Sequence, residues 1–205
     1  MAQQDKRTSI IEAAVCVFSR NGYYNSKVSQ IAKQAGVADG TIYLYFKNKE
    51  DLLIQVFLDT MDTILDRQAE ALRGVYDSAD RLRIFIEVHF ESVAKSPALA
   101  EVITVELRQS SKFMRNTDMK PFGRYLGMIA SIIRDGQEQG AFRSDLNPRR
   151  VARALFGVLD ELGLEWAMND RRVPIEEAQR HVLGIFLNGL LSQPEVSQPT
   201  NEELA

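Results

Sequence analysis

The residues VSQIAKQAGVADGTIYLYF at positions 28–46 decide the fold of this chain. Ile31 and Ala32 fall on the inward face of one short helix, and Ile42 returns to the core three residues after the expected start of a second helix. Between the two helices, Gly36 permits a left-handed backbone turn that other residues adopt only at a cost. Two short helices held at a steep angle by such a turn form a helix-turn-helix.

The second short helix would present small and hydroxyl-bearing residues on its outer face. A face of this kind suits the DNA major groove, because glycine admits a close approach and hydroxyl groups contact bases or phosphates. The alternative is that Tyr43, Tyr45 and Phe46 form an aromatic core stripe. Ile42 and Phe46 already supply an inward pair at i and i+4, which favours an outward position for the tyrosines. The expected outward residues are Gly40, Thr41, Tyr43 and Tyr45.

Apolar residues recur at helical spacing through the rest of the chain, and no convincing strand period appears. We therefore predict an all-α protein of about nine helices. Capping residues mark three helix starts: Ser26 before the second, Asn48 before the fourth, and Asn147 with Pro148 at the eighth. The expected helices span residues 6–21, 27–35, 39–45, 49–74, 79–94, 97–114, 121–139, 148–168 and 174–191.

The distribution of charge favours a nucleic-acid partner, although the net charge of −3 and the pI near 5.5 do not. Residues 1–50 carry seven basic and four acidic groups, a balance of +3, so the remaining chain carries −6. A basic head on an acidic body would turn one end of the molecule toward phosphates before contact.

Composition also argues against several classes of protein. No stretch reaches the roughly 18 apolar residues of a membrane span, and the polar N-terminus lacks the apolar core of a signal peptide, so we expect a cytoplasmic protein without a membrane partner. The single cysteine, Cys16, cannot form an intramolecular disulfide. His89 and His181 offer no metal spacing, and no nucleophile motif or phosphate-binding glycine loop appears. We expect no enzyme, no catalytic residue, no metal site and no cofactor.

Residues 10–53 resemble the TetR family of bacterial transcription regulators. The resemblance rests on an ordered combination: Phe18, then Gly22-Tyr23, IAKQAGV at 31–37, TIYLYF at 41–46 and KEDLL at 49–53. It implies a helix-turn-helix DNA-binding domain at 1–48, a helical ligand-binding and dimerisation domain at 49–191, and a homodimer on palindromic operator DNA. The polar tail at 192–205 is expected to be disordered.

The family's DNA contacts carry over position by position. The implied contacts are Ser26, Lys27, Gln30, Gly40, Thr41, Tyr43, Tyr45 and Lys49. Lys49 resembles the family's phosphate-binding lysine. Ala38 and Asp39 stand where the family commonly has Ser and Lys, which removes one positive contact, and Tyr45 replaces a frequent histidine. We therefore expect DNA affinity to rest on hydroxyl groups, Lys27 and Lys49.

A narrower resemblance extends into the body. Residues 31–54, VELRQS at 105–110 and FGVLDELGLEWAMND at 156–170 look like the FadR-type branch, which represses fatty-acid degradation genes and responds to long-chain acyl-CoA. It implies a repressor that releases its operator when an acyl-CoA binds the body. The alternative is a repressor whose pocket takes another hydrophobic ligand or a cationic drug, which aromatic and acidic walls would favour.

The residues of the body are compatible with an acyl-CoA site. Arg108 is the strongest single candidate, because a buried arginine needs an anionic partner, either a ligand phosphate or an acid such as Asp160. The alternatives are that the apolar stripes are ordinary core and the basic cluster is solvated surface. The expected tunnel comprises Phe57, Met61, Leu65, Phe85, Val88, Leu99, Ile103, Leu107, Met128, Phe156 and Leu159. The expected polar contacts are Arg108, Arg115, Lys120 and Arg124 for phosphates, with Asp160, Glu161, Trp166 and Asn169 for other groups.

The last two helices are expected to form the homodimer contact. Two apolar stripes at helical spacing support this, and two helices from each subunit would make a four-helix contact that places two recognition helices on a palindrome. The alternative is that both stripes pack within one subunit. The stripes comprise Val151, Ala154, Leu155 and Val158, and then Val182, Ile185, Phe186 and Gly189.

Overall fold

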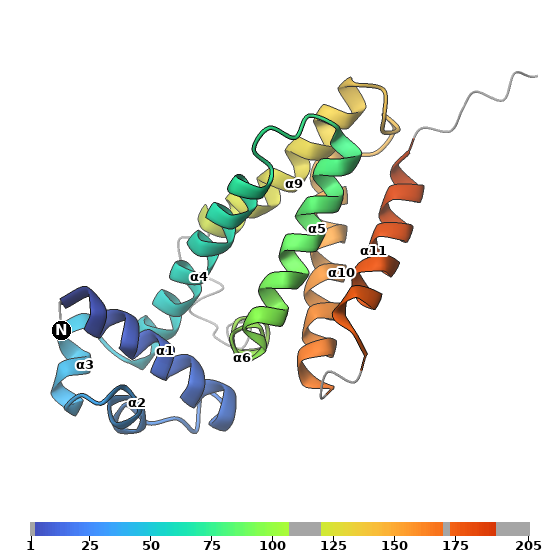
Figure 1. Ribbon diagram of the computed structural model, residues 1–205. Coiled ribbons are helices and arrows are strands. Elements are labelled where there is room, and N and C mark those ends of the chain that lie inside the picture. The colour runs from blue at the N-terminus through green and yellow to red at the C-terminus, as the bar shows by residue number, and fades with distance from the viewer. Residues whose placement is uncertain (1–2, 107–119, 170–172, 192–205) are drawn as a thin grey trace, which may run out of the picture.

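The computed structural model describes residues 3–106, 120–169 and 173–191. Within these ranges the chain forms nine α-helices and one π-helical segment, which confirms the all-α prediction. Three helices form a compact head at one end of the molecule, and the others run alongside one another as an elongated body (Figure 1). The head contains α1 (Gln3–Asn21), α2 (Val28–Ala35) and α3 (Asp39–Tyr45).

The body is built around α4, α5, α9 and α10, and α11 covers its outer side (Figure 1). The short α6 lies next to the head and packs against α1 as well as α10. None of the described helices is both long and apolar enough to cross a membrane. The bounds are α4 (Lys49–Ala71), α5 (Ser78–Lys95), α6 (Pro97–Glu101), the π-helix η1 (Val102–Glu106), α9 (Lys120–Glu138), α10 (Pro148–Met168) and α11 (Ile175–Leu190).

The turn between α2 and α3 forms as the sequence pattern predicts. Gly36 has a φ of 68°, and the Val37 amide donates to the Ala32 carbonyl at 3.0 Å, which closes the end of α2. Ile42 and Phe46 are buried against the rest of the head. Phe46 is therefore a core residue, as expected.

The start of α2 differs from the prediction. Ser26 does not cap this helix; the N-cap is Lys27, whose amide donates to the Gln30 side chain at 2.8 Å. The Ser26 hydroxyl donates instead to the Gly22 carbonyl at 2.7 Å, because the side chain turns into the head. The two asparagine caps are confirmed: Asn48 accepts from the Asp51 amide at 2.8 Å, and Asn147 accepts from the first turn of α10.

The predicted helix at 97–114 is interrupted. The chain leaves α-helical geometry at Val102 and continues as the π-helix η1 to Glu106, so this stretch is not one regular α-helix. π-Helical turns cost backbone regularity and occur frequently at functional sites. Residues 107–114 and the tail at 192–205 lie outside the described residues, so the predictions for them stay predictions.

Gly136 on α9 provides a stability test. A Cβ atom there would lie 2.2 Å from the Phe142 ring, whereas one at Gly127 on the same helix would meet nothing within 4 Å. We expect Gly136→Ala to lower the free energy of unfolding by about 1–3 kcal/mol through overpacking. Gly127→Ala, the control, should raise it by about 0.5–1 kcal/mol through helix propensity. Urea unfolding measures both, and equal effects would contradict the packing at Gly136.

Candidate functional site

The outer face of α3 carries the predicted recognition residues. Tyr43 is 57% exposed, and Gly40 is also exposed. Thr41 is half-buried, and Tyr45 packs partly against the core beside the Phe46 ring, 6.3 Å away between centroids. The structure thus places Tyr43 and Gly40 fully at the surface, whereas Tyr45 combines a core contact with partial exposure.

A hollow of about 500 Å³ lies where the starts of α2 and α4 meet α3. Lys27 is exposed at its rim, and Gln30, one turn further on, is exposed as well. Ser26 belongs to this region but is only 3% exposed, with its hydroxyl directed to the Gly22 and Val17 carbonyls. The Ser26 hydroxyl is therefore not exposed for the predicted DNA contact, because it bonds to carbonyls within the head.

Lys49 also differs from its predicted role. Its ammonium group donates to the carbonyls of Tyr23, Ser26 and Tyr24 at 2.7, 2.8 and 3.3 Å. It also lies 4.4 Å from the centre of the Tyr23 ring, a cation–π contact. Because an ammonium has three N–H donors, the side chain is occupied in fastening the α1–α2 turn to α4 rather than free for a phosphate. Lys47, two residues earlier, is exposed.

The body encloses an apolar cavity of about 410 Å³ between α4, α5, α6, η1, α9 and α10. Its size is in the range of small-molecule sites, and its walls are mostly aliphatic and aromatic with a few polar groups. The lining residues are Phe57, Thr60, Met61, Ile64, His89, Ser92, Val93, Ser96, Leu99, Ala100, Ile103, Thr104, Phe122, Tyr125, Phe156, Asp160, Gly163 and Leu164.

Four of these residues form a polar wall: Thr104, Asp160, His89 and Tyr125. The Thr104 hydroxyl donates to the Asp160 carboxylate at 3.0 Å, and His89 Nδ1 and the Tyr125 hydroxyl share a hydrogen bond of 2.8 Å. His89 Nε2 is buried and has no hydrogen-bond partner among the described residues. Burial lowers the pKa of His89 to about 4, opposed in part by the Leu159 carbonyl. Burial, with the nearby Asp160 charge, raises the pKa of Tyr125.

Five of the twelve predicted ligand residues line the cavity: Phe57, Met61, Ile103, Phe156 and Asp160. The structure therefore brings these five residues, from α4, η1 and α10, to one cavity, and their contact with a ligand stays a prediction. Leu107, Arg108 and Arg115 lie outside the described residues, so their predicted contacts stay predictions.

Three other predicted ligand residues do not line the cavity. Phe85 is fully buried behind it, with its ring 5.0 Å from that of Tyr125 between centroids. Met128 packs against the core on the following turns of α9. Arg124 is largely exposed and pairs with Asp62 at 3.7 Å, which joins α9 to α4 outside the wall that Tyr125 lines from within.

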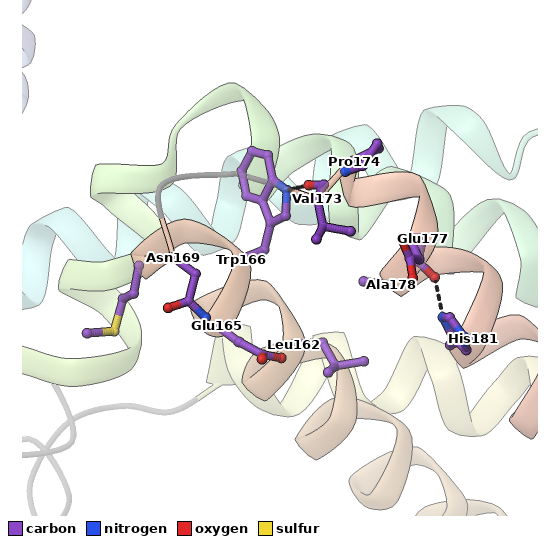
Figure 2. Close-up of a pocket in the computed structure, with 10 residues that line it drawn as sticks. Leu162, Glu165, Trp166, Asn169, Val173, Pro174, Glu177, Ala178 and His181 are labelled. Atoms are coloured by element: carbon purple, nitrogen blue, oxygen red, sulfur yellow. Dashed lines mark hydrogen bonds between the residues drawn. The ribbon is translucent and has the colours of Figure 1, made fainter.

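Trp166 lies in a different hollow, at the end of α10 and the start of α11 (Figure 2). Its indole N–H donates to the Val173 carbonyl at 2.8 Å, with Glu165 on one side and Glu177 beyond it. Residues 156–170 contain both Asp160, which faces the cavity, and Trp166, which does not. Trp166 and Asp160 therefore line different hollows, and the predicted ligand contact of Trp166 stays a prediction.

Sequence reasoning missed most of the polar groups of the cavity. His89 and Ser92 are three residues apart on α5, which places them on one helix face, and Ser96 follows at the end of that helix. That spacing was visible in the sequence. The pairing of His89 with Tyr125 was not, because it joins two helices 36 residues apart. No group of three or more metal-ligating side chains occurs in the part of the chain that the structure describes.

The expected dimer stripes divide between two faces. Leu155 and Val182 are buried within the subunit. Ala154 and Ile185 face outward, and Ile185 is 65% exposed. Outward glycines at 157, 184 and 189 leave this face of α10 and α11 low in profile. The surface is suited to a close helix contact, while the partly buried Val151, Val158 and Phe186 also pack against the core of the subunit.

Comparison with known proteins decides the family. Residues 10–56 match the bacterial regulatory proteins of the tetR family, and residues 57–189 match the C-terminal region of YsiA-like proteins. The chain belongs to the TetR family. It is therefore a transcription regulator with a helix-turn-helix DNA-binding domain and a helical C-terminal region, as the sequence predicts.

Three relatives of this chain are informative. The fatty acid metabolism regulator protein of Bacillus subtilis is 38% identical over 92% of this chain and 97% of its own. A structure of FadR from Bacillus subtilis with stearoyl-CoA is 39% identical, covers 89% of this chain and 98% of that one, and has a TM-score of 0.83. A regulator from Saccharomonospora viridis with choline is 25% identical over 93% and 100%, with a TM-score of 0.78.

The buried His89 predicts how the free energy of unfolding depends on pH. Its pKa falls from 6.5 in the unfolded chain to about 4 in the fold, so the unfolded state binds more protons between these pH values. Stability is full above pH 6.5 and is lost as pH falls toward 4, by up to about 1.4 kcal/mol per pH unit.

Urea unfolding between pH 7 and pH 4.5 should show this loss in the wild type relative to His89→Gln, which cannot titrate there. His181→Gln, at an exposed position, is the control and should follow the wild type. Parallel curves for the wild type and His89→Gln would contradict the burial of an uncharged imidazole.

Proposed function

We propose that this protein is a repressor of fatty-acid degradation genes that binds a palindromic operator as a dimer and is released by a long-chain acyl-CoA. The observation that carries this proposal is the apolar cavity of about 410 Å³ in the body. It occurs in a chain that is 39% identical to a regulator whose structure contains stearoyl-CoA. The relatives described above are regulators rather than enzymes, and the same role is proposed here.

The cavity supplies the two environments that an acyl thioester needs. Phe57, Met61 and Ile103 offer an apolar surface for the hydrocarbon chain, whose burial contributes about 0.8 kcal/mol per CH₂. The polar wall offers Thr104 and Asp160 to the thioester and the amide groups that follow it. Arg124 lies exposed outside this wall, where it can meet a phosphate of the CoA moiety. Arg108 and Arg115 are proposed to do the same.

The walls of the cavity also provide a route to the head. α4 lines the cavity with Phe57 and Met61 and is joined to α1 by the ion pair of Arg7 with Asp59, at 2.5 and 3.1 Å. α6 and η1 line the cavity too, and both pack against α1. A ligand that displaces these elements changes the orientation of the head. In a dimer this would change the spacing of two recognition helices.

The dimer is proposed to form through the outer face of α10 and α11. Ile185 stands 65% exposed there, beside glycine positions that allow a close approach. A two-fold contact of this surface with its copy would bury it and would place two heads on a palindrome. Within the operator complex, Tyr43, Gly40 and Thr41 would face the bases, and Lys27 would face phosphates.

A cationic effector is a second candidate. Asp160 places a carboxylate in a cavity walled by Phe122, Tyr125 and Phe156, and aromatic faces with an acid attract quaternary ammonium groups. A relative at 25% identity was solved with choline. Choline is therefore a direct comparison ligand for stearoyl-CoA.

Filling the cavity should abolish the response to ligand. Ala100 lines the cavity, so Ala100→Phe places a ring where the acyl chain is proposed to lie. We expect unchanged operator binding and at least a tenfold higher stearoyl-CoA concentration for release, measured by fluorescence anisotropy. Trp166→Phe, in the other hollow, is the matched control and should respond as the wild type. Release by choline but not by any acyl-CoA would favour the second candidate, and release by neither would overturn both.

Gly40 should show opposite effects on stability and DNA binding. A Cβ there meets nothing within 4 Å, so Gly40→Ala should stabilise the free protein by about 0.5 kcal/mol. If α3 lies against DNA, the added methyl group should weaken operator binding by about tenfold, or 1.4 kcal/mol. Thermal unfolding and anisotropy measure the two effects, and Gly127→Ala is the control for helix propensity alone. An alanine variant that is more stable and binds the operator equally well would remove Gly40 from the interface.

A further inference from the structure

Leu44 stands 82% exposed near the C-terminal end of α3. It is the one aliphatic side chain among the strongly exposed apolar residues of the described head. Burying a leucine side chain is worth about 1.5–3 kcal/mol, so the free protein leaves this contribution unused. The other strongly exposed aliphatic residues that the structure describes lie on or beside α10 and α11: Met168, Val173, Ile185 and Leu191.

The register of α3 fixes the direction of Leu44. Ile42 and Phe46 are buried at i and i+4 on the inward face. Gly40 and Leu44 are also four residues apart, so they share the opposite ridge, one turn above the other. Because a Cβ at Gly40 would meet nothing within 4 Å, the surface beside Leu44 is open and lacks a side chain. An approaching surface can therefore reach the Leu44 methyl groups.

The surroundings of Leu44 favour DNA as the occupant of this ridge. Exposed Lys27 and Lys47 lie on the elements that flank α3, and exposed Tyr43 precedes Leu44 in the chain, so the head carries cationic and hydroxyl donors as well as this apolar group. Residues 1–50 carry a net charge of +3, which opposes contact with another copy of the same surface.

The isobutyl side chain of Leu44 can distinguish thymine from the other three bases. It has no hydrogen-bond donor or acceptor, and thymine is the base that presents an apolar group, its 5-methyl, in the major groove. We propose that Leu44 selects thymine at one position of each operator half-site by packing against that methyl group. Since this rests on the proposed function, it requires that the protein bind a specific palindrome.

The test replaces thymine by deoxyuridine, which removes the 5-methyl group and keeps every hydrogen-bonding atom. An operator is first selected from a random duplex library with the full-length protein, and each symmetric thymine pair is then replaced in turn. For the wild type we expect one pair whose replacement weakens binding about fourfold per half-site, or about fifteenfold for both, the loss of a buried methyl contact. For Leu44→Ala the same replacement should have no effect.

Two further variants make the result specific. Leu44→Met keeps an apolar group and should retain most of the discrimination between thymine and deoxyuridine. Tyr76→Ala removes an apolar side chain that is 85% exposed in the loop between α4 and α5, and it should behave as the wild type. Both substitutions are at the surface and leave the core intact.

The outcomes separate this inference from the proposed function. Selection of no specific palindrome would overturn the proposed function and the role of Leu44 together. Specific binding in which no thymine pair is sensitive to deoxyuridine, or in which Leu44→Ala keeps the sensitivity, would overturn the role of Leu44 alone. A change in the oligomeric state of DNA-free Leu44→Ala would assign the residue to contact with a second copy instead, and would also overturn it.

Discussion

The attachment of the head to α4 depends on the Lys49 ammonium group. Its hydrogen bonds to the carbonyls of Tyr23, Tyr24 and Ser26 close the turn after α1 and hold it against the first turn of α4. Hydrogen bonds from a charged donor are about twice as strong as neutral ones, and here one donor group satisfies three backbone carbonyls. The orientation of α2 and α3 is thereby fixed relative to α4, and α4 is the helix that extends from the head into the body. If these hydrogen bonds were absent, the turn between α1 and α2 would deform when α4 moved, and the orientation of α3 would not change.

The second point of attachment lies further along the same helix. Arg7 makes a two-bond ion pair with Asp59, bonds to Gln55 at 3.2 Å, and lies 5.7 Å from the centre of the Phe46 ring. The N-terminal part of α1 is thus fixed about two to three turns into α4, in the stretch of this helix that also carries Phe57 and Met61. Two attachments along one helix constrain its direction relative to the head as well as its position. A displacement of α4 at the cavity would therefore change the orientation of the surface at the far end of the head.

The parts of this arrangement that the sequence predicts are local. The Ile42 and Phe46 pair, the Gly36 turn and the asparagine caps at 48 and 147 depend on neighbours within one or two helical turns, so spacing alone reveals them. Lys49 and Ser26 were assigned to DNA because the resemblance to the TetR family implies contacts at these positions. Their true partners are carbonyls up to 26 residues away, which no spacing indicates.

The same limit applies to the body. Phe57 and Met61 were predicted because the apolar stripe of α4 must be buried. The stripe does not indicate whether it lines a cavity or packs in the core. Phe85 and Trp166 illustrate this limit. Phe85 is a core residue behind the cavity, and Trp166 lies in another hollow. The change from α-helix to π-helix at Val102 is another feature that the apolar spacing did not reveal; η1 packs against α1, and its Thr104 bonds to Asp160 on α10.

Where this chain departs from the rules of a stable monomer, the departures fall at the proposed contacts. Gly40 lowers the propensity of a seven-residue helix, and Leu44 exposes an apolar side chain on it. His89 leaves a buried ring nitrogen without a partner beside an open cavity. Each feature costs stability in the free protein, and under the proposed function each would be relieved by a ligand or by DNA. A contact with either partner would bury these groups, so these positions mark where the proposed ligand and the proposed operator would meet the chain.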